Sequence, residues 1–205
     1  MSGMIVRRAV EGDLEALVLA YTAATADEAS RAWITMAGPV PEETQLAFLT
    51  ESVRRHLTND EVLVADRDGR IEGFSVWRWI DSRERLHAEA EELAAMAEAT
   101  GLAVLGRAET ARRATIAAQP GRFPYLYLYL IAVMPQSRGS GTGGAMLRQG
   151  LREADTAGLA TYLEASTEDS ARLYKRCGFE EFGTRLQLPD DGPELIPMYR
   201  VPVRS

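Results

Sequence analysis

The chain has 205 residues, which is long enough for one domain with a sizeable core. Apolar residues make up 46% of it and charged residues 26%, a composition that excludes an intrinsically disordered protein. The net charge is −7, from 23 basic and 30 acidic residues. This charge argues against general binding to nucleic acid or to anionic membranes, and it mildly favours a cationic substrate such as an amine.

The numbers of cysteines and histidines narrow the possible classes of protein further. Cys177 is the only cysteine, so no internal disulfide can form, and we expect a reducing, cytoplasmic compartment. A packing role before Gly178 suits Cys177 better than a nucleophilic one. The two histidines, His56 and His87, belong to no metal-ligand cluster, so no metal is expected. The sequence contains no apolar run of roughly eighteen residues, so no membrane span is predicted.

The first eighty residues predict three strands and two helices. Alternation predicts a strand over residues 4–9, and apolar residues recur at helical spacing from Leu14 onwards. A second helix is expected to open at Glu42, after Pro41. Residues 61–66 and 71–79 are typical of strands, joined by the polar turn at 67–70. Gly73 in the second of these strands indicates a bulge or a close backbone approach.

Trp77 and Trp79 alternate with Arg78 in that strand, so both indoles are predicted on one face of the sheet. Packing in the core is the more frequent role of such a pair. Stacking on a substrate is the alternative, and it makes Trp77 a candidate substrate contact.

Residues 83–118 form an Ala- and Glu-rich segment with apolar residues near helical spacing. We expect two or three helices, broken near Gly101 and Gly106. The charges between residues 83 and 92 are interpreted as a solvated helix face.

The stretch from residue 125 to residue 151 organises the chain. An apolar, aromatic strand is expected up to Val133, and Pro135 ends it because proline has no N–H to donate. Four glycines follow within six positions, and a helix begins after them. Strand, glycine turn and helix together aim backbone N–H groups and the positive end of a helix dipole at an anion, so we interpret this turn as a phosphate-binding site. A flexible loop is the alternative.

Two glycine patterns fit this turn. Gly139, Gly141 and Gly144 spell G-x-G-x-x-G, with Glu164 twenty residues further on, as in a dinucleotide-binding unit. Only about sixty residues follow the turn, too few for the remaining strands of a doubly wound sheet, whose fingerprint normally opens the domain. A Walker loop is excluded because Gly-Lys-Ser/Thr does not occur. The second pattern, R-x-x-G-x-G from Arg138 after V-x-P, is that of acyl-CoA-dependent acetyltransferases.

The rest of the chain extends this likeness. A strand over 159–165 and a short helix over 170–175 precede two last strands, 182–188 and 198–203, with a loop at 189–197. The segment SARLYKRCGFEEFG resembles the closing signature of the GNAT superfamily of N-acetyltransferases. The run VMPQSRGSGTGGAML…YLEAS…LYKRCGF…MYR is similar to the branch that contains puromycin N-acetyltransferase. Arg7, Ala9 and Asp13 match the start of a GNAT domain more weakly.

The resemblance implies one mixed α/β domain over residues 1–205. It has a central, largely antiparallel sheet of about seven strands flanked by helices, and a helical insertion at about 82–119 between the third and fourth strands. It also implies acetyl-CoA as the cofactor. The turn's backbone would bind the pyrophosphate through Arg138, Gly139, Ser140, Gly141, Thr142, Gly143 and Gly144.

The strand before the turn would pair with the pantetheine arm through Ile131, Ala132 and Val133. The Val133 N–H is then the natural oxyanion donor, a role worth ~3 kcal/mol when the donor is preorganised.

Two residues match catalytic positions of the family. Tyr174 corresponds to a tyrosine near the cofactor sulfur, and it could protonate the departing thiolate; the alternative is a buried tyrosine on an amphipathic helix. Glu164 corresponds to a glutamate near the acceptor amine, with a structural ion pair as its alternative. Tyr127, Tyr129 and Trp33 are candidate walls of the acceptor groove, and core or surface packing is the competing role for each.

Three functions are weighed. The first is transfer of acetyl from acetyl-CoA to a small-molecule amine by direct attack, without a covalent enzyme intermediate. The second is acetylation of a protein N-terminus or lysine, which needs an open groove that the insertion argues against. The third is a non-catalytic acyl-CoA-binding module, against which Tyr174 and Glu164 count. Dimers are common in the superfamily, so a homodimer is one assembly that the resemblance allows.

Overall fold

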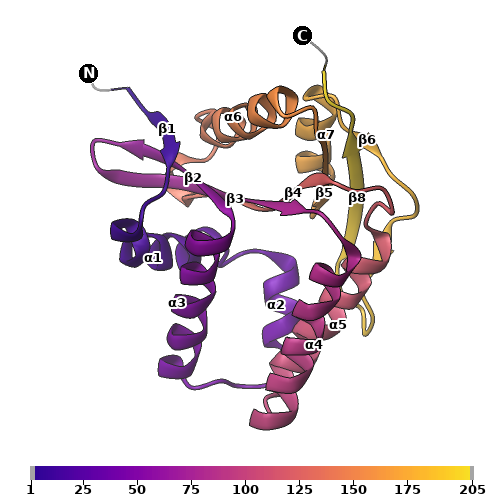
Figure 1. Cartoon of the computed structure of the whole chain (residues 1–205). Helices are drawn as coiled ribbons and strands as arrows, with labels where there is room; N and C mark the ends of the chain where they lie inside the picture. Colours follow the sequence, from indigo (N-terminus) through magenta and orange to yellow (C-terminus); the bar gives the residue numbers. More distant parts are fainter. Residues whose placement is uncertain (1–2, 204–205) are drawn as a thin grey trace.

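The computed structural model describes residues 3–203 and consists of one eight-stranded mixed sheet with helices on both of its faces (Figure 1). The strands are β1 Ile5–Arg8, β2 Glu61–Arg67, β3 Arg70–Ile80, β4 Tyr125–Val133, β5 Ala160–Ala165, β6 Glu180–Glu181, β7 Leu186–Gln187 and β8 Glu194–Arg200. The α-helices are α1 Leu14–Ala24, α2 Ala29–Thr35, α3 Glu42–Asn59, α4 Arg83–Thr100, α5 Ala103–Ala118, α6 Thr142–Thr156 and α7 Glu168–Arg176.

The strand order is β1-β2-β3-β4-β5-β8-β6, and β7 pairs with β8 beyond this path. Every pairing is antiparallel except β4 with β5, which is parallel. The expected mixed, largely antiparallel sheet with a helical insertion between the third and fourth strands is therefore confirmed. The sheet has eight strands in place of about seven, because the segment 182–188 holds only the short strand β7, while β6 lies before it.

Helices α6 and α7 cover one face of the sheet, and α1, α3, α4 and α5 lie on the other (Figure 1). The strand β4 shows how the two faces divide. Leu126 and Leu128 belong to the core under α6 and α7, whereas Tyr125 and Tyr127 pack with α4 and α5. This alternation is the period of two expected of a strand buried on both faces. We call these the α6 face and the α5 face.

The insertion consists of two helices rather than three. Gly101 ends α4 in the left-handed conformation with φ of 66°, which is the usual stop for a helix. The break expected at Gly106 is wrong, because this residue lies inside α5. Residues 24–41, which lie between the first two predicted helices, include a further helix, α2. The loop expected at 189–197 is also shorter, because β8 already begins at Glu194.

Two glycines let α6 lie close to the sheet. A Cβ on Gly150 of α6 would meet the Trp77 ring at 2.2 Å, and one on Gly73 would meet Ala132 O at 2.8 Å and Met146 Cε at 2.9 Å. Gly73 therefore marks the close approach predicted for it, and it lies next to a register shift between β2 and β3. The first residues of α6 are thus held against the end of β4. Among residues 3–203, no helix is long and apolar enough to cross a membrane.

Candidate functional site

The parallel strands β4 and β5 separate after a short contact. Their pairing covers only residues 125–127 of β4 against 160–162 of β5, although β4 continues to Val133 and β5 to Ala165. Beyond Tyr127 the edge of β4 that faces β5 has no strand partner in the described part of the chain. The hydrogen-bonded sheet therefore opens at its middle, between the α6 face and the α5 face.

The free edge of β4 offers backbone groups for a ligand. Met134 donates its N–H to Glu72 O of β3 at 2.9 Å, and hydrogen-bonded and non-bonded residues alternate along an antiparallel pair. Ile131 and Val133 accordingly turn their N–H groups away from β3, towards the opening. Ala132 turns its backbone to β3, and its side chain packs with α1 and α3. Of the three strand residues expected to meet the cofactor, two thus present their backbone to the opening and one does not.

A register shift between Val76 and Trp77 leaves Tyr129 without a paired residue on β3. Such a bulge bends the strand and redirects a side chain. Here it lies where β4 leaves β5, and the ring of Tyr129 comes to line a cavity on the α5 face.

The glycine turn lies directly beyond this edge. Gly139 and Gly141 have φ of 75° and 88°, which glycine adopts readily, and a Cβ on either would meet nothing within 4 Å. The N–H of Ala145 is the first of α6 with a helical partner, Gly141 O at 3.0 Å. The N–H groups of residues 142–144 precede it and stay available, and no acidic residue lies in this first turn. These features fit a bound phosphate.

Side chains of the turn serve the protein itself. Arg138 Nη2 donates to Asp27 Oδ1 at 2.8 Å and to Ala24 O at 3.1 Å, so this guanidinium ties the turn to the end of α1. Ser140 Oγ lies 2.8 Å from Thr142 Oγ1, and Thr142 is buried. Only the backbone of the turn is left free to bind a phosphate.

Tyr174 lies on the α6 face. Its ring packs in the core with Phe179, 5.8 Å away between ring centroids, and with side chains of β4 and β5. Burial raises the pKa of its phenol above the usual value of 10.0. The hydroxyl makes no hydrogen bond within residues 3–203, yet it is not among the fully enclosed polar atoms that lack a partner. The hydroxyl is therefore not fully enclosed, although the ring that carries it is buried.

Glu164 lies on the α5 face, two residues after Tyr162 on β5. Tyr127 donates its hydroxyl to Glu164 Oε2 at 2.7 Å, and Glu164 Oε1 is enclosed without a hydrogen bond in the described structure. Burial raises the pKa of Glu164 to about 7, an effect that the hydrogen bond from Tyr127 partly offsets. The two candidate catalytic residues thus lie on opposite faces of the sheet.

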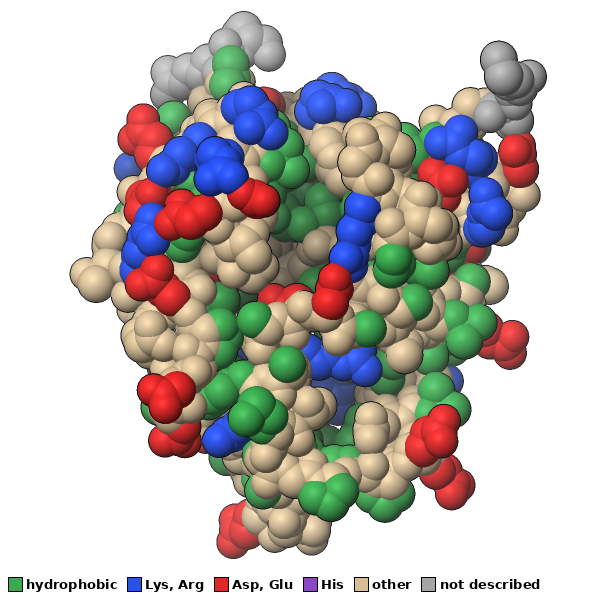
Figure 2. All heavy atoms as spheres, turned by 180° about the vertical axis from the view of Figure 1, so that it is seen from behind, with side chains coloured by type: hydrophobic (Ala, Val, Ile, Leu, Met, Phe, Trp, Pro, Cys, Tyr) green, Lys and Arg blue, Asp and Glu red, His purple; other side chains and the backbone are tan. Residues whose placement is uncertain are grey.

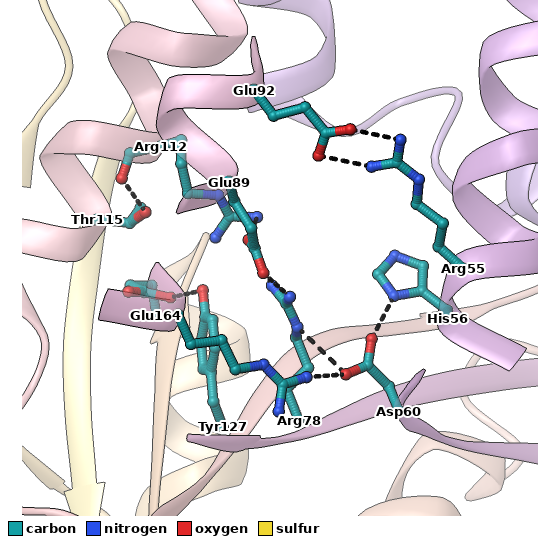
Figure 3. Close-up of polar contacts among 11 residues, drawn as sticks. Arg55, His56, Asp60, Arg78, Glu89, Glu92, Arg112, Thr115, Tyr127 and Glu164 are labelled. Carbon is teal, nitrogen blue, oxygen red and sulfur yellow. Dashed lines mark hydrogen bonds and ion pairs between the residues drawn. The ribbon is translucent and has the colours of Figure 1, made fainter. Parts of the chain in front are cut away.

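A cavity of about 660 Å³ lies on the α5 face between α3 and α4. Tyr129, Arg78, Arg112 and Asp60 line its inner end, while residues of α3 and α4 form its walls. In Figure 3, the carboxylate of Glu89 lies between the guanidinium groups of Arg112 and Arg78. Figure 2 shows a hollow with largely hydrophobic walls on the rear surface, and Lys or Arg side chains deep in an opening below it.

The tryptophan candidates lie elsewhere. Trp77 is 1% exposed beneath α6 and donates its indole N–H to Ser75 Oγ at 2.9 Å, so the core role applies to it. Trp79 is half exposed. Trp33 is buried in α2, where the Arg107 guanidinium stacks on its ring at 4.9 Å. Neither Trp77 nor Trp33 lines the cavity, whereas Tyr129 does.

The charged residues of the cavity were missed by the sequence analysis. Glu89 and Glu92 were interpreted as parts of a solvated helix face, but Glu89 binds buried Arg78 and Glu92 binds Arg55 across the cavity. One signal could have located this network. A charged residue inside a strand that is apolar on both sides, as Arg78 is between two tryptophans, needs a partner if it is buried.

Comparisons with known proteins agree with this geometry. A family model described as the Acetyltransferase (GNAT) family matches residues 24–179. A structure from Corynebacterium glutamicum, described as histone acetyltransferase HPA2 and related acetyltransferase, is 25% identical, with a TM-score of 0.69 over 100% of this chain and 99% of that one. Polyamine N-acetyltransferase of Drosophila melanogaster is 21% identical, with a TM-score of 0.67 over 97% and 100%.

Mosquito arylalkylamine N-acetyltransferase like 5b is 17% identical, with a TM-score of 0.66 over 97% of this chain and 100% of that one. At these identities the insect enzymes support the fold alone. The family match covers most of the chain, and members of this family are N-acetyltransferases that use acetyl-CoA as acetyl donor. The chain therefore belongs to the GNAT acetyltransferase family and is an acyltransferase.

Proposed function

We propose that this enzyme transfers an acetyl group from acetyl-CoA to the primary amine of a small molecule, by direct attack within a ternary complex. The opening between β4 and β5 carries the proposal, because the glycine turn follows the end of β4 while Glu164 and the cavity lie on the α5 face beside the same strands. A donor bound from one side and an acceptor bound from the other can meet there without a covalent enzyme intermediate.

The residues of the turn and of β4 suit acetyl-CoA. The backbone of the glycine turn, with the available N–H groups of residues 142–144, would hold the pyrophosphate, and the backbone of Ile131 would pair with the pantetheine arm. When bound, acetyl-CoA supplies an activated thioester. The N–H of Val133 faces the opening and would donate a hydrogen bond to the thioester oxygen as negative charge develops on it.

Glu164 is the proposed proton acceptor. An ammonium group must lose a proton before its nitrogen can attack the thioester carbon, and the Glu164 carboxylate can take this proton directly or through one water. A pKa of about 7 suits this role, since the group is then ionised in about half of the molecules at neutral pH. The hydrogen bond from Tyr127 fixes the orientation of the carboxylate.

Tyr174 is the proposed proton donor. As the carbon–sulfur bond breaks, the sulfur takes the phenolic proton of Tyr174. Burial raises the pKa of this phenol, which alone would weaken it as an acid. A thiolate that forms in the same apolar surroundings is disfavoured by the same desolvation, so the two groups stay matched.

The proposal also covers the branch of the family, the location of the enzyme and its assembly. The motifs from residue 133 to residue 200 support membership of the branch that contains puromycin N-acetyltransferase. We also propose that the chain is one domain acting in the cytoplasm; a homodimer is one assembly that the family resemblance allows.

The test is steady-state thiol release from acetyl-CoA across a panel of primary amines, puromycin and short peptides included. We expect amine-dependent release that falls roughly 10²- to 10⁴-fold in Tyr174→Phe, while CoA still raises the melting temperature of the variant. Tyr199→Phe, which removes a hydroxyl from β8 next to Phe182, is the matched control and should keep activity.

Three other outcomes contradict parts of the proposal. Release stimulated only by peptides would favour the protein-acceptor alternative. Parallel initial-velocity lines with an acetylated Cys177 would refute direct attack. An absence of CoA stabilisation would refute the phosphate-binding turn and with it the proposed cofactor site.

A further inference from the structure

Every acidic residue that lines the cavity is already paired. Glu92 accepts two hydrogen bonds from Arg55, at 2.6 and 2.7 Å, and Glu51 binds Arg54 at 2.8 Å. Deeper in the cavity, Asp60 binds Arg85 at 2.9 Å and lies 2.8 Å from His56 Nδ1.

Glu89 accepts hydrogen bonds from both terminal nitrogens of Arg78. The Nε of Arg78 also lies 3.5 Å from Asp60 Oδ1. No carboxylate of the lining is therefore left over to bind an ammonium group.

Arg112 differs from the other cations of the cavity. Its side chain is only 11% exposed, yet its guanidinium makes no hydrogen bond to a carboxylate within residues 3–203, and the Tyr127 hydroxyl is a hydrogen-bonding neighbour. Its contacts are Glu89 at 3.6 Å and the face of the Tyr129 ring at 4.9 Å. None of its nitrogens is among the enclosed polar atoms without partners, and Arg112 lines the cavity. Its unused N–H donors therefore face the open space.

The charges at the inner end do not balance. Three guanidinium groups, those of Arg78, Arg85 and Arg112, share two carboxylates, those of Asp60 and Glu89. Glu164 also acts on Arg112, but its hydrogen-bonded oxygen accepts from Tyr127 rather than from the guanidinium. Burying a guanidinium without a partner is costly, so an anion supplied by a ligand would be bound strongly here.

We propose that Arg112 binds a carboxylate of the acceptor, so that the enzyme acetylates amines that also carry a carboxylate, namely amino acids, rather than polyamines or simple arylalkylamines. A planar guanidinium with free N–H groups matches a carboxylate through two parallel hydrogen bonds. This inference rests on the proposed function, because it identifies the acceptor of that same reaction.

Arg112 and Glu164 act on the same part of the α5 face. Glu164, the proposed proton acceptor, bonds Tyr127, and Tyr127 and Tyr129 pack edge to face with centroids 5.9 Å apart. Burial alone would lower the pKa of Arg112, but the neighbouring oxygens of Tyr129, Tyr127 and Glu164 outweigh it and raise this pKa. Arg112 and Glu164 thus act on one small region. An acceptor that carries both an amine and a carboxylate can therefore meet both residues.

The experiment compares acceptors that differ only at the carboxylate: phenylalanine, phenylalaninamide and phenethylamine; lysine and cadaverine; arginine and agmatine. We expect kcat/KM for the carboxylate member to exceed that of its partner by on the order of 10- to 100-fold. Arg112→Gln should abolish this ratio and Arg112→Lys should keep part of it. The ratio cancels any effect of either variant that is common to both acceptors.

Arg113→Gln is the matched control, since Arg113 is the adjacent arginine of α5, is 52% exposed and binds Glu109. It should leave the ratio unchanged. Faster acetylation of cadaverine, agmatine or phenethylamine would overturn the inference and leave the proposed function intact, as would equal rates for phenylalanine and its amide. An absence of release with every amine would overturn the proposed function itself.

Discussion

Replacing Glu164 by Gln tests whether this carboxyl is kept for catalysis at the expense of stability. Burial raises its pKa from 4.5 to about 7 in the folded chain. The folded state therefore binds more protons than the unfolded state between these values, and stability falls as the pH rises through them. At 1.36 kcal/mol per pKa unit, the difference between the two pKa values lowers the free energy of unfolding by about 3 kcal/mol above pH 7.

Glutamine has nearly the same shape, can accept the hydrogen bond from Tyr127 and carries no charge. We therefore expect Glu164→Gln to match the wild type in stability near pH 4.5 and to exceed it by up to about 3 kcal/mol at pH 8. For a chain of this length, this gain raises the melting temperature by roughly 6 to 12 °C. Activity should change in the opposite direction, because an amide cannot take a proton from the amine.

Two measurements check this reasoning. Denaturant unfolding of both proteins from pH 4.5 to 8 gives the difference in stability, and kcat/KM over the same range gives the role in catalysis. Wild-type kcat/KM should rise with pH through about 7. The reasoning is refuted if the stability difference is independent of pH, or if Glu164→Gln keeps the wild-type pH profile.

Three other substitutions test the glycine turn, the packing of α6 on the sheet and the buried ion pair of Arg78. Gly141→Ala forces a Cβ onto a residue with φ of 88°; we expect a loss of ~1 kcal/mol in stability and weaker CoA binding by calorimetry. Gly150→Ala places a methyl group 2.2 Å from the Trp77 ring and should cost about 1–3 kcal/mol in denaturant unfolding. Asp60→Asn leaves buried Arg78 short of negative charge, and should cost about 3–5 kcal/mol in the same assay.

Each substitution has a control within the chain. Gly101→Ala imposes similar backbone strain at φ of 66° at the end of α4, so it should lower stability without changing CoA binding. Gly106→Ala, where a methyl group meets nothing within 4 Å, should stabilise α5 by roughly 0.5–1 kcal/mol. Asp169→Asn, at an exposed position of α7, should have little effect on stability. An equal loss of CoA affinity in Gly141→Ala and Gly101→Ala, or an equal loss of stability within either of the other two pairs, would contradict the role given to that position.

The sequence correctly predicted features that depend only on residues adjacent in the chain. The glycine turn after β4 and the start of α6 follow from a few adjacent residues, and their positions agree with the structure. The end of the loop before β8 was predicted wrongly, because tertiary contacts decide whether a proline can lie in a strand. Pro197 was assigned to a loop, yet it lies in β8 opposite Glu164, where its carbonyl accepts the N–H of Phe182 and no N–H is needed.

The charged cavity shows why the rest could not be predicted. Arg78 lies on β3, its partner Glu89 on α4 and Arg112 on α5, and only the packing of the insertion onto the sheet brings them together. A run of glutamates on one helix is the same letter pattern whether it faces water or a buried arginine. Helical spacing places Glu89 and Glu92 on one face, but it does not say which face is covered.

Net charge and site charge carry different information about the acceptor. The charge of −7 describes the average surface, and it pointed to a cationic substrate. In the cavity the acidic residues are matched by arginines, and Arg112 is left facing open space. An amino acid satisfies both observations, because its ammonium group is drawn to an acidic protein while its carboxylate meets the guanidinium. Discrimination between amino acid and polyamine would then depend on one residue of the insertion rather than on the sheet that binds the cofactor.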